Sequence, residues 1–188
     1  EKGTNSQYVV LTFNNIIDDS PDGIVAVQLS SVNNNWANIP KAGFTSSVGW
    51  NLNAATQGAV TVYARFWDKA GNVSDVTTKS VIYDTVIPNG NLQLNTQVTT
   101  NASITTSKSI VLEISGDTDI EYFGVSNNYD VNNLGTVYWE WKDFDATNQP
   151  LLYNWTISSV VGDNSVTIQF KDYAGNISDV KTRHITLQ

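Results

Sequence analysis

The chain contains two copies of one sequence pattern, and this repeat limits the folds that the chain can adopt. Residues 62–76 and residues 166–180 are identical at most positions, and Asp68 and Asp172 lie 104 residues apart. About 100 residues is the size of a small domain. The repeat therefore predicts two domains of the same fold in tandem.

The break between the two copies is marked by turn residues. Pro88 cannot donate to a strand ladder, and Asn89-Gly90 is a turn pair. We therefore predict one domain over residues 1–86 and a second over residues 87–188. The linker is short, so the two domains are expected to be close neighbours.

Each half consists of short alternating segments separated by turns. Val166, Ile168 and Phe170 alternate with polar residues, which is the period of a half-buried strand. No segment has a helical period. We predict an all-β fold of two tandem immunoglobulin-like β-sandwich domains. The expected strands cover residues 8–14, 24–31, 46–52, 59–67 and 74–83 in the first half, and 91–95, 109–115, 120–127, 136–143, 151–158, 165–171 and 178–187 in the second.

The two halves differ at their start. About twenty residues separate the linker from the strand at Ile110, whereas seven precede Tyr8. The first domain is therefore expected to lack its opening strand. Either the chain was cut from a longer protein or a partner supplies that strand, because an uncovered sheet edge is a liability.

Composition excludes several classes of function. The formal net charge is −8, and no basic stripe is visible, which argues against nucleic-acid binding and against docking on an anionic membrane. No stretch approaches the length of a membrane span. The chain has no Cys, which excludes thiolate catalysis, zinc–cysteine sites and disulfides.

The repeated motif Asp-x-Ala-Gly-Asn-x-Ser, at Asp68–Ser74 and Asp172–Ser178, resembles the penultimate hairpin of bacterial Ig-like domains. The linker Asp84-Thr85-Val86-Ile87-Pro88 is similar to the junction common between such domains. The resemblance implies a secreted or cell-surface protein of adhesin or S-layer-associated type. Turn-making explains the motif itself, because Gly and Asn accept a positive φ and Asp accepts bonds from turn amides.

Carboxylates gather in the loops that an Ig-like fold brings to one pole, and calcium requires several oxygen ligands. In the second domain a calcium site is predicted from Asp84, Asp117, Asp119 and Asp172. A possible second site in the first domain consists of Asp18, Asp19, Asp22 and Asp68. The alternative is that these aspartates only cap turns. Residues 87–188 carry 5 basic and 11 acidic side chains, against 5 and 7 in residues 1–86, so the second domain is the preferred cation site.

Aromatic residues suggest a different kind of site. Trp139 and Trp141 are expected on one face of a strand, and Trp36 in an Asn-rich loop. Exposed Trp rings stack on sugars or fill partner pockets. Core packing is the alternative for these three residues. It is the interpretation preferred for Trp50, Trp67 and Trp155.

Catalysis has little support in the sequence. The single histidine, His184, is expected on a solvated strand position, and no catalytic or phosphate-binding motif is present. The sequence therefore predicts a non-catalytic extracellular spacer or binding module. Its partners would be other subunits, repeats of the same protein or a surface glycan. The alternatives are a glycan-binding accessory module of a polysaccharide-active enzyme and a virion or filament subunit.

Overall fold

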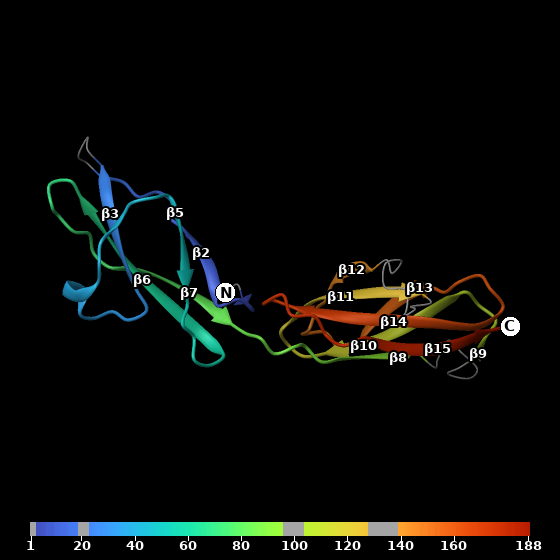
Figure 1. Cartoon of the computed structure of the whole chain (residues 1–188). Coiled ribbons are helices and arrows are strands. Elements are labelled where there is room, and N and C mark those ends of the chain that lie inside the picture. Colours follow the sequence, from blue (N-terminus) through green and yellow to red (C-terminus); the bar gives the residue numbers. More distant parts are fainter. Residues whose placement is uncertain (1–2, 19–22, 96–103, 128–138) are drawn as a thin grey trace. The chain divides into compact units, whose positions relative to one another are not determined.

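The computed structural model describes residues 3–18, 23–95, 104–127 and 139–188. The chain divides into two compact units, Glu1–Thr85 and Val86–Gln188. The first unit ends one residue before the end of the predicted first domain. Both units consist of β-strands (Figure 1).

The second unit is a sandwich of two sheets. One sheet has the strand order β13-β10-β8, and the other has the order β12-β11-β14-β15-β9. Strands β15 and β9 pair in parallel, and the other pairs are antiparallel. The bounds are β8 Gly90–Leu94, β9 Ile104–Thr105, β10 Ser109–Gly116, β11 Ile120–Asn127, β12 Glu140–Asp143, β13 Leu151–Thr156, β14 Gly162–Asp172 and β15 Lys181–Leu187.

The first unit repeats most of this arrangement. Its larger sheet has the order β1-β7-β6-β3-β4, and its smaller sheet contains β2 and β5. The bounds are β1 Gly3–Thr4, β2 Tyr8–Thr12, β3 Ile24–Ser30, β4 Ala42–Gly43, β5 Ser47–Asn51, β6 Gly58–Asp68 and β7 Thr77–Tyr83, with a 3₁₀ turn, η1, over Trp36–Asn38. The predicted all-β fold of tandem β-sandwich domains is confirmed.

Strand pairing establishes which elements of the two units are equivalent. Val9 of β2 lies opposite Trp50 of β5, and Ile110 of β10 lies opposite Trp155 of β13. β1 pairs in parallel with β7, as β9 does with β15. Strand β2 therefore corresponds to β10, and β6 and β7 correspond to β14 and β15.

The residues before β2 make a series of hydrogen bonds between Ser and Thr hydroxyls and backbone amides, and the residues before β10 make the same series. Thr4 Oγ1 accepts the Ser6 N–H at 3.1 Å, and Ser6 Oγ accepts the Tyr8 N–H at 3.0 Å. Thr105, Ser107 and Ser109 make the same two bonds at 3.0 and 3.1 Å. Ser and Thr side chains satisfy nearby amides in this way where the chain leaves one strand for another.

The second unit has a deep apolar core. Side chains from both sheets are buried there, because alternate residues of each strand point inward. Phe123, Phe144 and Tyr153 pack edge to face within it. The buried residues are Leu92, Leu94, Ile110, Leu112, Ile114, Ile120, Phe123, Val125, Phe144, Ile157, Val166, Ile168, Phe170, Ile185 and Leu187.

The first unit has a much smaller core among its described residues. Its buried cluster consists of Val27, Ala64 and Phe66, with partly buried neighbours around it. Phe13 packs edge to face on Phe66 at 5.4 Å between ring centroids. No described residue of this unit pairs with β2 on the side where β8 pairs with β10. The short β1 takes the place of β9, and the missing opening strand stays a prediction.

Two predicted strands begin earlier than the observed ones. Residues 74–76 and 178–180 precede β7 and β15, because the motif makes isolated bridges at Val73 and Ile177 before the returning strands start. No helix among the described residues has both the length and the apolar character needed to cross a bilayer.

Candidate functional site

The repeated motif forms the same hydrogen-bonded turn in both units. In the first unit, Asp68 Oδ1 accepts the Asn72 N–H and Asp68 Oδ2 accepts the Asn72 side-chain amide, both at 2.7 Å. Asp172 and Asn176 repeat these bonds at 2.8 Å. Gly71 and Gly175 have φ of 95° and 91°, values that favour glycine. The sequence order Asp-x-Ala-Gly-Asn therefore encodes the turn locally.

A serine completes the turn by bonding back to the preceding strand. Ser74 N–H donates to Phe66 O at 2.9 Å, and Ser74 Oγ accepts the Phe66 N–H at 3.0 Å. Ser178 and Phe170 make the same pair of bonds, both at 2.9 Å. The motif therefore fixes the conformation of the loop that joins the last two strands of each unit.

The two copies of the turn differ in burial. Asp172, Asn176 and Ser178 are buried, whereas Asn72 and Ser74 are exposed. The Asn72 side-chain amide, helped by backbone N–H groups of the turn, lowers the pKa of Asp68 below its ordinary value. In the second unit the Asp, Asn and Ser side chains of the turn are shielded from solvent, while Tyr173 and Ile177 of the same turn are exposed.

The second unit places two of its predicted calcium ligands together. Carboxylate oxygens of Asp119 and Asp172 lie within 4.8 Å of one another. The Tyr173 N–H donates to the Asp119 carbonyl at 3.2 Å, which ties the two loops to each other. Asp117 is engaged elsewhere, because its Oδ2 accepts the Asn89 N–H at 2.8 Å. Asp84 belongs to the first unit, so its part in this site stays a prediction.

The possible second site is only partly described. Asp19 and Asp22 lie outside the described residues. Asp68 is held by Asn72, and Asp18 is half-buried next to the undescribed segment. Acidic groups of three or more around these two residues do not occur within the described part of the first unit.

Trp139 and Trp141 lie together over β11. Their ring centroids are 6.3 Å apart with an interplanar angle of 41°. A Cβ on Gly124 would lie 3.2 Å from the Trp141 ring and 3.3 Å from that of Trp139, so the glycine lets both rings approach the strand. Trp141 is 37% exposed. Trp141 thus presents aromatic surface on the edge strand β12, and Trp139 lies directly before that strand.

Trp36, in contrast, is part of a stack on the first unit. The Arg65 guanidinium lies 4.7 Å from the Trp36 ring centroid and 5.5 Å from that of Trp67. Lys41 Nζ lies 3.2 Å from the Trp67 centroid. Cations over indole rings are stabilising contacts. One face of the Trp36 ring is therefore covered by Arg65.

Sequence reasoning missed the residue that organises this stack. Gln28 is 3% exposed, and its Oε1 accepts hydrogen bonds from Arg65 Nε and Trp67 Nε1, both at 2.8 Å. Its Nε2 donates to the Trp36 carbonyl at 3.2 Å. The sequence contained one indication of this role, because Gln28 is the single polar residue within the apolar segment 24–29. A buried side-chain amide requires hydrogen-bond partners.

The prediction of core positions for three tryptophans is wrong for Trp67. Arg65 and Trp67 share the face of β6 opposite Phe66, because side chains alternate along a strand. Trp50 and Trp155 are half-buried, and Trp155 packs against the core of the second unit. Trp155 Nε1 donates to Asn127 Oδ1 at 2.7 Å.

His184 lies on the exposed face of β15. Its Nδ1 is 3.0 Å from Asp163 Oδ2, and both side chains are 66% exposed. An ion pair at this exposure contributes little to stability. The position agrees with the solvated strand site expected from the sequence.

Comparisons with solved structures identify the fold. The chain is similar to the fibronectin(III)-like modules of Clostridium thermocellum CbhA, with a TM-score of 0.54 and 14% identity, over 100% of this chain and 89% of that one. It is also similar to the FN1–FN3 domains of chicken CNTN1, with a TM-score of 0.53 and 7% identity, over 98% of this chain and 64% of that one. Both units thus have a fibronectin III-like β-sandwich fold. No protein-family model and no curated protein sequence matches the chain.

Proposed function

We propose that the chain is a non-catalytic module of an extracellular, bacterial-type surface protein, in which the two β-sandwiches act as spacers that present a binding surface. The observation that carries this proposal is the duplicated turn, in which Asp68 and Asp172 make matching bonds in two compact units. Repetition of one rigid unit lengthens a protein without adding a new active site. The likeness to fibronectin III-like modules supports the same proposal.

Stretching single molecules tests the spacer role. A tandem spacer should unfold in two separate steps. About 3.5 Å per extended residue gives length increments of about 30 nm for Glu1–Thr85 and about 36 nm for Val86–Gln188. A variant with both Asp68→Ala and Asp172→Ala should unfold at lower force in both steps. One cooperative step for the whole chain would contradict the proposal.

Calcium binding is proposed at the Asp119–Asp172 pair of the second unit. Each Asp172 oxygen already accepts one bond from Asn176, and a carboxylate oxygen has a second lone pair for a hard cation. Calorimetric titration of the chelator-treated chain should give binding heat that is lost in Asp119→Asn. Asp163→Asn, an acidic site elsewhere in the unit, is the matched control. Asp84→Asn tests the linker carboxylate, and no heat from the unchanged chain at millimolar calcium would refute the site.

A glycan-binding role is the second candidate, favoured by the Trp139–Trp141 pair. Adjacent indole rings with an exposed face provide a stacking surface for sugar rings. Gel retardation on a panel of polysaccharides should show binding that falls at least about tenfold in Trp141→Ala, in line with the loss of a binding hot spot. Trp36→Ala is the control, because the Trp36 ring stacks under Arg65. Equal loss in both variants, or no retardation, would exclude this role for the pair.

A further inference from the structure

We propose that the first unit binds the carboxylate groups of an acidic polysaccharide at Arg65 and Lys41, on the outer face of its larger sheet. The ligand class is a sugar polymer in which carboxylates alternate with hydroxyl groups. This site is separate from the Trp139–Trp141 pair and from the proposed calcium ligands, and its ligand would bind whether or not those sites are occupied.

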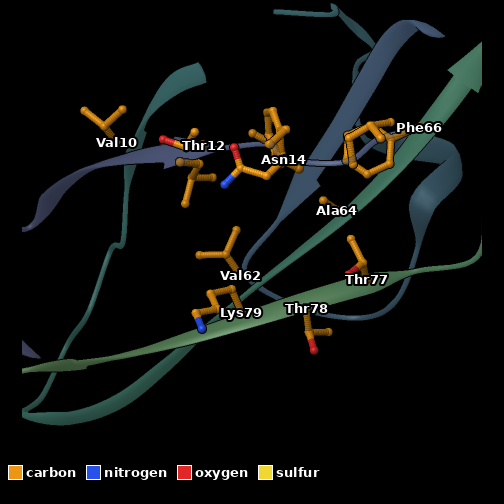
Figure 2. A pocket seen from close by; sticks show the side chains of 13 residues that line it. Val10, Thr12, Asn14, Val62, Ala64, Phe66, Thr77, Thr78 and Lys79 are labelled. Carbon is orange, nitrogen blue, oxygen red and sulfur yellow. The ribbon is translucent and has the colours of Figure 1, made fainter. Parts of the chain in front are cut away.

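The site lies on the face of β6 that points away from the core. Val62, Ala64 and Phe66 are buried and line a pocket on the inner side of the strand (Figure 2). Side chains alternate along a strand, so Arg65 and Trp67 lie on the opposite face. Both residues are only half-buried, and solvent therefore reaches this face of the strand.

Gln28 of β3 fixes the position of the Arg65 guanidinium. Gln28 lies opposite Arg65 in the pairing of β3 with β6, and its Oε1 accepts hydrogen bonds from Arg65 Nε and Trp67 Nε1. A guanidinium has five N–H donors, and the bond to Gln28 uses one of them. The acceptor is a neutral amide, so this contact orients the guanidinium without neutralising its charge.

The same glutamine holds the loop that follows β3. Gln28 Nε2 donates to the carbonyl groups of Trp36 and Ile39, so a buried side chain anchors the loop at two points. The Arg65 guanidinium lies 4.7 Å from the centroid of the Trp36 ring. Because the loop and the strand are already fixed to each other, a ligand that binds here has little further ordering to impose.

Two cations contact the Trp67 ring. Lys41 Nζ lies 3.2 Å from the ring centroid, and the Arg65 guanidinium lies 5.5 Å from it. Among the residues that the structure describes, no carboxylate makes an ion pair with Lys41 or Arg65. The indole attracts both cations, but it does not cancel their charge. Two uncompensated cations therefore favour an anionic ligand at this face, although the chain has a net charge of −8.

Amide side chains beside these cations favour a sugar polymer as the anion. Asn33, Asn35 and Asn38 are exposed. Asn33 Oδ1 accepts the Trp36 Nε1–H at 3.2 Å, and Asn38 Nδ2 donates to Asn35 Oδ1 at 3.0 Å. Within the described part of the chain, these bonds leave the amide N–H groups of Asn33 and Asn35 available to a ligand. Sugar hydroxyls both donate and accept hydrogen bonds, so they match amide groups next to a bound carboxylate.

Gel retardation of the full chain tests the site with polygalacturonate and alginate, two polysaccharides that carry one carboxylate per sugar. Arg65→Gln should weaken binding by about tenfold or more, because hydrogen bonds between charged groups are lost, and Lys41→Gln should also weaken it. Lys79→Gln is the matched control, because Lys79 is an exposed cation opposite Val62 and lies on the other face of the same sheet. It should leave binding unchanged.

The polymer supplies a second test that leaves the chain unchanged. Methyl esterification of polygalacturonate removes the charge of its carboxylates and should weaken binding by about tenfold or more. This result does not depend on whether Arg65→Gln disturbs folding. Trp141→Ala should leave binding of the charged polymer intact, which separates this site from the Trp139–Trp141 pair.

Absence of binding to both acidic polymers, or equal binding of the esterified polymer, would overturn the proposal. Equal losses in Arg65→Gln and Lys79→Gln would show that binding reflects net charge and not this site. Poly-L-glutamate bound as tightly as polygalacturonate would assign the site to an acidic protein segment and would overturn the polysaccharide ligand.

Discussion

The two units share a turn and a strand register but differ in how deeply they bury the same positions. Ile110, Leu112 and Ile114 of β10 are fully buried, and their equivalents Val9, Leu11 and Phe13 are only half-buried. The inner faces of the two strands are similarly apolar, so composition does not explain the difference. The second unit has β8 across this edge, which brings Leu92 and Leu94 into the core.

This comparison shows that formation of the turn and burial of the core depend on different parts of the sequence. The Asp-x-Ala-Gly-Asn-x-Ser turn closes a hairpin from local bonds alone, since it forms in both units. Burial of the core requires a strand that is remote from the turn in sequence. The polar side chains of the turn are exposed in the first unit, at Asn72 and Ser74, and buried in the second, at Asn176 and Ser178.

The largest expected effect comes from removing an equivalent core leucine in each unit. Leu112→Ala should destabilise the second unit by about 2–5 kcal/mol, because the cavity left in a closed core cannot collapse. Leu11→Ala should cost the first unit less than half of that, because Leu11 is only half-buried and already lines an open pocket of about 520 Å³. Urea denaturation combined with hydrogen exchange in each unit measures both. Equal losses would show that the two cores are equally closed.

A smaller loss is expected from Gly90→Ala. The added Cβ would meet the Phe170 ring at 2.2 Å, and such overpacking costs about 1–3 kcal/mol. Gly43→Ala is the control in the first unit, where a Cβ has no heavy atom within 4 Å. Thermal unfolding of the two variants checks this. A Gly90→Ala protein as stable as the Gly43→Ala protein would mean that β8 is loosely packed.

The two copies of the turn should respond unequally to loss of the aspartate. Asp172→Ala leaves the buried Asn176 amide without its acceptor, at a cost of about 1–3 kcal/mol. Asp68→Ala should have a smaller effect, because water can replace the lost bonds of the exposed Asn72. Chemical denaturation of both variants compares the turns directly. A larger loss of stability from Asp68→Ala than from Asp172→Ala would contradict the conclusion that the turn of the second unit is the more buried one.

The smallest expected effect is the loss of stability of the first unit at low pH. Because the folded-state pKa of Asp68 lies below its ordinary value of 3.8, the stabilisation is fully present above that value and is lost as the pH falls through the lowered pKa. Asn72→Ala should return the pKa of Asp68 towards the ordinary value, as followed by NMR titration of the carboxyl carbon. Asp145, whose pKa is lowered by the Thr147 hydroxyl and amide, should titrate unchanged. An unshifted Asp68 in Asn72→Ala would refute the role of the amide.

Much of the fold could be predicted because strand periodicity and turn chemistry are local properties. The alternation at Val166, Ile168 and Phe170 indicated the inward face of β14, and the structure buries all three. The same rule applied to β6 would have placed Trp67 on the outer face with Arg65. The prediction of a core Trp67 was wrong because it relied on the general tendency of aromatic residues to anchor β-sandwiches and not on the position of Trp67 in the strand.

The candidate sites could be predicted less well, because they depend on how loops and strands meet. Asp117 and Asp119 are two residues apart, but Asp117 bonds to Asn89 while Asp119 lies beside Asp172. Gln28 gathers Arg65 and Trp67 through contacts that span 37 and 39 residues of sequence. No spacing in the sequence indicates such pairings.

The sequence by itself determined the repeat, the strand pattern and the two Asp-Asn turns, because each of these depends on residues that are close neighbours in the chain. Only the tertiary structure decided how deeply each copy buries the same positions and which carboxylate lies beside Asp172. Burial and such pairings depend on segments that are distant from the turn in sequence, and local preferences carry no information about them.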